Sequence, residues 1–433
     1  GTLMRAGSFP PAFQKGECHM KIRYPEYYKK FHCLAGECPD TCCVAWEIAV
    51  DRETAEKYKK FSRDGSRVGK KLGKRIRHGK IVPEGEYCPF LGVDHLCDIY
   101  RKYGEESMCR ICRHYPRHME DYGELHEVLL LISCPEAARL MLTEGEGFLI
   151  REKPEVSGNT EGIDRELLEG LLTLRKRLFQ VLSDRSRPMD MRMLTVLKLC
   201  HDGQKWIRDG KTADMKRLLE ESAADSSWEE RLEKEDDSLE EKRFTMMADM
   251  MAELASFDRV SRKWPAMLEQ CRTILYHSPD SRSRYLKDRK EFLKEHPETE
   301  LRWERICRYF LYSFFLTSLY DGEVYAKGKM AVFCTLLMEE LFLASWRMDE
   351  GKEIWGTEHP EKTLAEQVKI CHVAARQIEN SAENRARLEE LLNPSSVQSD
   401  NLSGKIGRGL GQLKDQLGSF LGRSHAARGN FLQ

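Results

Sequence analysis

Nine of the fifteen cysteines in this 433-residue chain fall between Cys33 and Cys134, grouped in pairs and triplets. Such grouping constrains the fold, because this spacing suits metal ligation better than disulfide bonds, with merely buried thiols as the alternative. The groups read Cys33-x4-Cys38-x3-Cys42-Cys43, Cys88-Pro, Cys97-Asp, Cys109-x2-Cys112 and Cys134-Pro. The other six cysteines are scattered singly, and there we expect buried, inert thiols.

The compartment predicted for these thiols is the reducing cytoplasm. No apolar run reaches the roughly 18 residues of a membrane span, and residues 1–20 lack the apolar core of a secretory signal. In a reducing compartment, clustered cysteines more often bind metal or perform redox chemistry than form disulfides. The formal charge of −1 argues against a surface that coats nucleic acid. Neither nucleic acid nor a membrane is therefore an expected partner.

Changes in composition divide the chain into four segments. Residues 1–19 have no helical or strand periodicity and are interpreted as a leader or an added segment. Residues 20–150 hold the cysteine groups between short apolar runs, and we expect a bound metal to supply much of their order. Residues 151–393 show long helical periods after a polar break at 151–160. Residues 394–433 form a glycine-rich tail that we expect to be flexible.

Periodicity predicts a mainly α protein, in which a cysteine-rich metal-cluster domain is followed by a helical bundle or array. In the first domain the pattern favours helices at 52–61 and 135–142 and a strand at 125–132. In the second, apolar residues recur at three and four positions, which places them on one helix face. These helical patterns occupy residues 163–181, 191–207, 228–257, 264–276, 301–319, 330–346 and 364–378.

The cysteine-rich segment can hold either of two kinds of metal site. Intracellular thiolates bind zinc in a closed tetrahedron, or an iron–sulfur cluster on four cysteines. Zinc fingers favour two close pairs separated by a loop. Here one tight group is followed by single cysteines, several of them before proline, and this dispersal favours a cluster. A purely structural zinc domain is the alternative.

Basic residues interleave the last cysteine groups, namely Arg110, Arg113, His114, Arg117 and His118. They can balance the charge of several thiolates in a low-dielectric site, or they can lie on a helix surface. The planar guanidinium fork also suits a carboxylate. Arg113 and Arg117 are therefore candidates to bind the amino-acid end of a cofactor.

In combination, the cysteine motifs resemble those of the flagellin lysine N-methylases. The motifs are Phe31-His-Cys33-x4-Cys38-Pro-Asp-Thr-Cys42-Cys43-Val-Ala-Trp46, Cys88-Pro-Phe-Leu, Leu-Cys97-Asp-Ile, Cys112-Arg-His-Tyr-Pro-Arg117 and Ser-Cys134-Pro-Glu-Ala-Ala-Arg139. Over a shorter span they are also similar to small cysteine-rich proteins of the zinc- or iron-chelating type. Two helical stretches resemble weaker motifs of the methylase family, namely Trp303-Glu-Arg-Ile-Cys-Arg-Tyr-Phe and Ala375-Arg-Gln-Ile-Glu379-Asn. The likeness spans residues 20–392.

The resemblance implies an enzyme that transfers methyl groups from S-adenosylmethionine to lysine ε-amines of flagellin or a similar protein. It also implies an iron–sulfur cluster of the 4Fe-4S type in the cysteine-rich domain. Family members commonly have glycine where this chain has Ala45, and Cys109 is extra relative to the motif. The implied metal ligands are Cys33, Cys38, Cys42, Cys43, Cys88, Cys97, Cys112 and Cys134. These are twice the four that one cluster needs, and spacing does not choose among them.

The residues that would bind the methyl donor are less well defined. The glycine-rich Rossmann fingerprint is missing. Gly145-Glu-Gly147 has no predicted strand before it, no third glycine at the required position and no matching acidic residue further along the chain. A sulfonium favours aromatic neighbours, so Trp46 and Tyr115 join Arg113 and Arg117 as predicted cofactor-binding residues. No motif identifies a catalytic base. The alternative function is a non-catalytic redox sensor or interaction protein that binds an iron–sulfur cluster or zinc.

Overall fold

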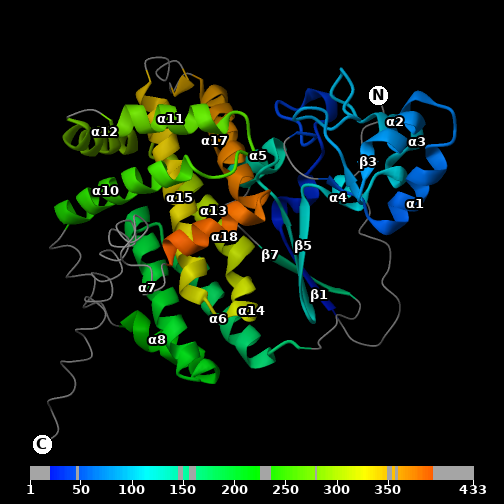
Figure 1. Ribbon diagram of the computed structural model, residues 1–433. Coiled ribbons are helices and arrows are strands. Elements are labelled where there is room, and N and C mark those ends of the chain that lie inside the picture. Colours follow the sequence, from blue (N-terminus) through cyan, green and yellow to red (C-terminus); the bar gives the residue numbers. More distant parts are fainter. Residues whose placement is uncertain are drawn as a thin grey trace, which may run out of the picture.

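The computed structural model describes residues 20–44, 48–144, 150–155, 162–224, 236–277, 280–348, 354–355 and 359–393 (Figure 1). Helices predominate in these ranges, which confirms the mainly α fold. A lobe of short elements around the cysteines lies on one side, and long helices form the other (Figure 1). The predicted leader and tail lie outside the described residues.

A four-stranded sheet lies between the cysteine-rich lobe and the long helices (Figure 1). Its strands are β1 (Met20–Pro25), β5 (Arg117–Tyr122), β6 (Leu125–Leu130) and β7 (Ile150–Glu155), in the order β5-β6-β1-β7. Strand β1 is parallel to β6, with Lys21 opposite Leu125, and antiparallel to β7. Every residue of β6 is buried, and this strand confirms the one predicted at 125–132. Strand β7 occupies part of the polar break expected at 151–160. Its sequence does not alternate between apolar and polar residues, and backbone pairing with β1 orders it instead.

The cysteine-rich lobe is built from short elements with a small core of their own. Its helices are α1 (Arg52–Phe61), α2 (Arg67–Arg75), α3 (Asp98–Tyr103) and α4 (Arg110–His114), with 3-10 turns η1 (Glu26–Lys30), η2 (Ala35–Glu37) and η3 (Glu105–Ser107). Strands β2 (Ile48–Ala49), β4 (Lys80–Ile81) and β3 (Ile76–Arg77) form a second sheet in that order. Helix α1 has the predicted bounds, and its N-cap carboxylate, Asp51, accepts a hydrogen bond from the Thr54 N–H at 3.0 Å.

The helical half confirms the predicted bundle. Its helices are α6 (Arg165–Leu182), α7 (Met189–Arg208), α8 (Met215–Ala224), α10 (Asp236–Leu254), α11 (Trp264–Leu275), α12 (Ser281–Glu295), α13 (Thr299–Phe314), α14 (Ser318–Asp321), α15 (Val324–Arg347), α17 (Pro360–Glu379) and α18 (Ala382–Leu392), with turns η4 (Thr212–Asp214) and η5 (Phe315–Thr317). Helix α15 is central, since it packs against α7, α11, α13 and α17. No periodicity predicted α12, because its sequence is largely polar. None of the described helices is long and apolar enough to cross a membrane.

Helix α5 (Pro135–Thr143) joins the sheet to the bundle. It begins with Pro135 in its first turn, as predicted, and packs against α13 and α17. Its buried side chains belong to the same apolar core as those of the bundle. This core also contains most of the singly placed cysteines, which confirms that they are buried; they are Cys200, Cys271, Cys307, Cys334 and Cys371.

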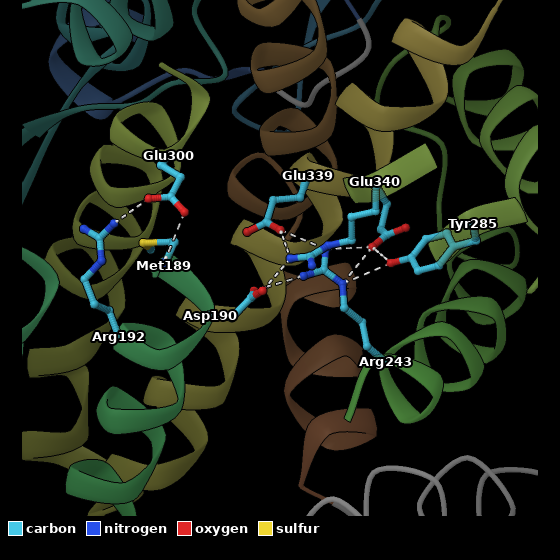
Figure 2. Close-up of polar contacts among 9 residues, drawn as sticks. Met189, Asp190, Arg192, Arg243, Tyr285, Glu300, Glu339 and Glu340 are labelled. Atoms are coloured by element: carbon cyan, nitrogen blue, oxygen red, sulfur yellow. Dashed lines mark hydrogen bonds and ion pairs between the residues drawn. The ribbon is translucent and has the colours of Figure 1, made fainter. Parts of the chain in front are cut away.

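Ionisable side chains from several helices meet inside the bundle (Figure 2). The Arg243 guanidinium from α10 lies 2.8 Å from Glu339, 2.8 Å from Glu340 and 3.3 Å from Asp190. The Tyr285 hydroxyl donates a second hydrogen bond to Glu340 at 2.7 Å. Asp190 comes from α7, Tyr285 from α12 and the two glutamates from α15. Together with Arg243 of α10, these contacts therefore connect four helices.

Candidate metal centre

Six cysteines line one small cavity of about 40 Å³ in the cysteine-rich lobe. They are Cys42, Cys43, Cys88, Cys97, Cys109 and Cys112. The rest of the wall is mainly apolar or aromatic and includes Ile48, Phe90 and Tyr115. The fold thus gathers soft sulfur donors from distant parts of the segment into a low-dielectric site. Cys109, the extra cysteine of the motif, belongs to this group.

Short local elements hold these thiols in place. Cys97 and Cys109 directly precede α3 and α4, and Cys112 lies three residues along α4, on the same side as Cys109. The Cys88 N–H donates to the Cys43 carbonyl at 2.8 Å, which fixes these two loops against each other. The start of α4 is tied to α1, because the Arg110 N–H donates to the Asp51 carboxylate at 2.9 Å.

The cavity thiols are coupled through hydrogen bonds between sulfurs. Hydrogen bonds with Cys42 and Cys88 lower the pKa of Cys43 to about 3, and the same bonds raise the pKa of both partners. A hydrogen bond between Cys109 and Cys112 lowers the pKa of Cys109 and raises that of Cys112. The neighbouring thiols therefore stabilise a thiolate at Cys43. A bound metal would displace the remaining protons, since thiolates are the ligating form.

The number and type of these donors are compatible with an iron–sulfur cluster. Within the described ranges, no three His, Cys, Asp or Glu side chains converge closely enough to hold one metal ion. A cluster distributes its thiolates over several iron atoms, so it needs donors around a cavity rather than at one point. The cavity supplies more than four such donors, and both the iron–sulfur cluster and the zinc alternative stay predictions.

The structure separates the remaining predicted ligands from this cavity. Cys33, Cys38 and Cys134 are not among its lining residues in the described part of the chain. The Cys38 thiol donates to the Asp40 carbonyl at 3.2 Å, and Cys134 directly precedes α5. Asp40 pairs with Arg376 of α17, and α5 packs against α17, so the segments of Cys38 and Cys134 both lead to that helix.

The four predicted cofactor-binding residues have different environments. Tyr115 lines the cavity, and its hydroxyl is hydrogen bonded to the Ser133 hydroxyl at 3.2 Å. Arg113 donates to the exposed Glu106 at 2.7 Å. The Arg117 guanidinium lies 5.1 Å from the centre of the Phe31 ring. Trp46 lies outside the described residues, and cofactor binding by all four stays a prediction.

Sequence reasoning assigned no role to several residues at the junction of the two halves. The Arg376 guanidinium donates to the Ser133 carbonyl at 3.2 Å and lies 3.4 Å from the Asp40 carboxylate. The Glu379 carboxylate accepts a hydrogen bond from the Ser133 N–H at 2.8 Å and another from the Tyr309 hydroxyl. Arg376, Glu379 and Tyr309 all fall within the two helical stretches that resembled family motifs. That resemblance was the only indication of them in the sequence.

An open pocket of about 750 Å³ lies where the sheet meets α6 and α13. Arginine side chains from three elements line it, together with the Phe179 ring and Lys176. The Arg175 guanidinium pairs with the buried Glu127 carboxylate, and Arg308 donates to the Ser183 hydroxyl at 2.7 Å. The size of the pocket suits a protruding side chain or a small molecule.

Comparison with known proteins relates this chain to lysine methylases. A family model, the FliB lysine N-methylase C-terminal domain, matches residues 175–402, which are more than half of the chain. The flagellar biosynthetic protein FliU of Salmonella muenchen is 26% identical over 144 residues. That alignment covers 31% of this chain and 85% of FliU.

Two further relatives are lysine-N-methylases, from Salmonella typhimurium and Salmonella choleraesuis. Each is 26% identical to this chain over 140 residues. The alignments cover 30% of this chain and 35% of each methylase, so the chain spans about a third of the length of these relatives. No solved structure matches.

Proposed function

This chain belongs to the FliB lysine N-methylase family, and from that premise we propose that it is a protein-lysine N-methyltransferase. The proposed methyl donor is S-adenosylmethionine, and the proposed acceptors are lysine ε-amines of flagellin or a flagellin-like protein. The reaction would depend on a 4Fe-4S cluster and would occur in the cytoplasm, where clustered thiols stay reduced. The observation that carries the proposal is that cysteines from several motifs that resemble those of the family line one cavity.

The proposed cluster ligands in the cavity are Cys43, Cys88, Cys97 and Cys112, with Cys42 and Cys109 as further thiols beside them. They come from separate motifs, so only the folded lobe assembles them. Their coupled hydrogen bonds already favour thiolate at Cys43. When bound, the cluster would supply a redox-active centre close to the methyl donor.

The substrate amine sets a physical requirement on the site. A lysine with its ordinary pKa of about 10.4 is almost fully protonated at neutral pH, and freeing its lone pair costs about 4.6 kcal/mol. An apolar surrounding lowers this cost, because desolvation disfavours the charged form. We expect the methylation rate to rise with pH through the neutral range.

Arg117 is the proposed partner of the donor carboxylate. Its guanidinium lies over Phe31, in the segment that leads to Cys33, whereas Arg113 already pairs with Glu106. We expect Arg117→Ala to weaken binding of S-adenosylmethionine in isothermal titration, and Arg113→Ala to weaken it less, because Arg113 already pairs with Glu106. Unchanged affinity in both variants would remove the two arginines from the donor site.

The helical half is proposed to bind the protein substrate. The open pocket between the sheet and α6 carries the exposed Lys176 at its edge, while Lys216 lies exposed on α8. We expect Lys176→Glu to raise the KM for flagellin and to leave donor affinity unchanged, since it alters only the substrate-facing surface. Lys216→Glu is the control, and an equal effect of both reversals would contradict a specific site.

The decisive test is mass spectrometry of flagellin after anaerobic incubation with the cluster-loaded protein and S-adenosylmethionine. The expected result is the addition of methyl groups on lysine. Cys88→Ser should abolish it, and Cys371→Ser, which changes a buried cysteine of the bundle, should not. If the loaded protein binds neither donor nor flagellin, and only its colour responds to oxidation, the redox-sensor alternative is correct.

A further inference from the structure

The open pocket where the sheet meets α6 and α13 is lined by more cations than carboxylates. Its ionisable lining residues are the cations Arg23, Arg175, Lys176 and Arg308 and one carboxylate, Asp184. The Asp184 carboxylate accepts hydrogen bonds from the Ser186 hydroxyl at 2.5 Å and the Ser186 N–H at 3.3 Å. The lining of this pocket therefore carries an excess of positive charge.

One side of the pocket is built on a single buried carboxylate. Glu127 of β6 is only 2% exposed, and it accepts a hydrogen bond from Arg175 at 2.7 Å. The Arg23 guanidinium of β1 lies 3.4 Å from the same carboxylate. Glu127 thus holds two guanidinium groups at the pocket wall, while its one negative charge can balance only one of them.

The other side repeats this arrangement at Glu304 of α13, whose side chain is fully buried. The Arg308 guanidinium, which lines the pocket, lies 3.6 Å from the Glu304 carboxylate. The guanidinium groups of Arg185 and Arg192 lie 3.0 Å and 3.1 Å from it. Burial lowers the pKa of Arg308, and the nearby Arg185 charge lowers it further, although Glu304 opposes this effect. An anion next to Arg308 would offset the repulsion between these guanidinium groups.

Aromatic and neutral polar side chains complete the pocket. The guanidinium groups of Arg175 and Arg308 lie 5.9 Å and 5.2 Å from the centre of the Phe179 ring, which helps to hold them in place. Thr173 and Gln180 belong to the same lining and can hydrogen bond to a peptide backbone. A Glu or Asp side chain matches this lining, because its carboxylate suits the guanidinium groups and its methylene stem suits the ring.

On the basis of the proposed function, in which the helical half binds a protein substrate, we propose that this pocket binds an acidic side chain of that substrate. Its carboxylate is held by the guanidinium groups of Arg23 and Arg308 through charge-assisted hydrogen bonds. Because the pocket is open, a free small anion would stay largely hydrated there, whereas the surrounding protein contacts hold an acidic side chain in place. The chain therefore selects lysines in segments that also carry Asp or Glu.

The test is the binding of labelled peptides to the intact chain, followed by fluorescence anisotropy. One peptide carries a lysine flanked by glutamates, and in the second peptide every glutamate is replaced by glutamine. We expect the acidic peptide to bind about tenfold more tightly at low salt, and the difference to shrink as salt is added. Equal binding of the two peptides would overturn the proposal.

Variants locate the effect in the pocket. Arg308→Gln should weaken binding of the acidic peptide about tenfold and leave binding of the neutral peptide unchanged. Lys176→Gln changes an exposed side chain, so it should keep the fold and weaken binding of the acidic peptide about threefold. The control is Lys216→Gln, at an exposed position of α8. An equal loss in the control, or an undiminished preference in both pocket variants, would place acidic binding elsewhere and overturn the proposal.

Inorganic phosphate distinguishes a peptide site from a site for small anions. Phosphate should displace the acidic peptide no better than chloride at the same ionic strength. If phosphate binds more tightly than the acidic peptide, and Arg308→Gln abolishes this, the pocket is a small-anion site and the proposal is wrong.

These binding measurements do not involve methyl transfer, so they separate the acidic site from the proposed enzyme activity. Methylation of the acidic and neutral peptides at equal rates would support the enzyme and overturn the acidic site. Preferential binding of the acidic peptide without any methylation would contradict the enzyme and support the acidic site.

Discussion

The buried carboxylate of Glu339 should make the stability of the helical half depend on pH. Its side chain is 2% exposed, and one of its oxygens, Oε1, has no hydrogen-bond partner among the described residues. Burial and the nearby Asp190 charge raise the pKa of Glu339 to about 7, although Arg243 and Arg289 oppose the increase. Three carboxylates here share two guanidinium groups, so the third carboxyl retains its proton more readily (Figure 2).

The direction of the effect follows from the raised pKa. The folded protein holds the Glu339 proton more tightly than the unfolded chain, whose carboxyl has the ordinary pKa of 4.5. The contribution to stability is therefore complete below pH 4.5 and is lost as the pH rises to about 7. At roughly 1.4 kcal/mol per pKa unit, the loss is about 3 kcal/mol.

Glu339→Gln tests this reasoning, because the amide has nearly the same shape as the protonated acid but does not titrate. We expect the variant to match the unaltered protein near pH 4.5 and to be more stable by about 3 kcal/mol at pH 8. The assay is urea unfolding followed by helical circular dichroism at several pH values. Glu361→Gln, an exposed change at the start of α17, controls for the loss of a carboxylate. If Glu339→Gln were destabilising by the same amount at every pH, Glu339 would be ionised throughout, and the interpretation would be wrong.

Three further changes test the site and the packing around it. Cys97→Ser should remove cluster absorbance and lower the melting temperature. Cys334→Ser, in the bundle core, should leave the absorbance unchanged, and an equal loss of absorbance in both variants would contradict the assignment of cavity ligands. Asp51→Ala should cost about 1 kcal/mol or more in a denaturant titration, since it removes a helix cap and the bond to the start of α4. Tyr309→Phe should cost about 1–3 kcal/mol by leaving the buried Glu379 with one partner fewer, and a neutral result would show that water replaces the hydroxyl.

The elements predicted correctly are those whose pattern is local. Helices α1 and α5, and most helices of the bundle, follow from apolar spacing of three and four residues, because that spacing defines a face within one element. The grouping of the cysteines is also a local pattern, and it is what predicts a metal domain. Strand β7 was not predicted, because pairing with β1 orders it. Helix α12 was not predicted, because its sequence is largely polar.

The sequence by itself therefore determined the fold class, the family and the set of candidate thiols. The tertiary structure decided which thiols are neighbours, because Cys43 and Cys112 are far apart in the chain and line one cavity only when α4 packs against β2. It also decided that Arg376 and His372 face Asp40, more than 300 residues away in sequence. Periodicity describes one element at a time, whereas these contacts depend on how whole elements pack, and a packing arrangement leaves no regular spacing in the chain.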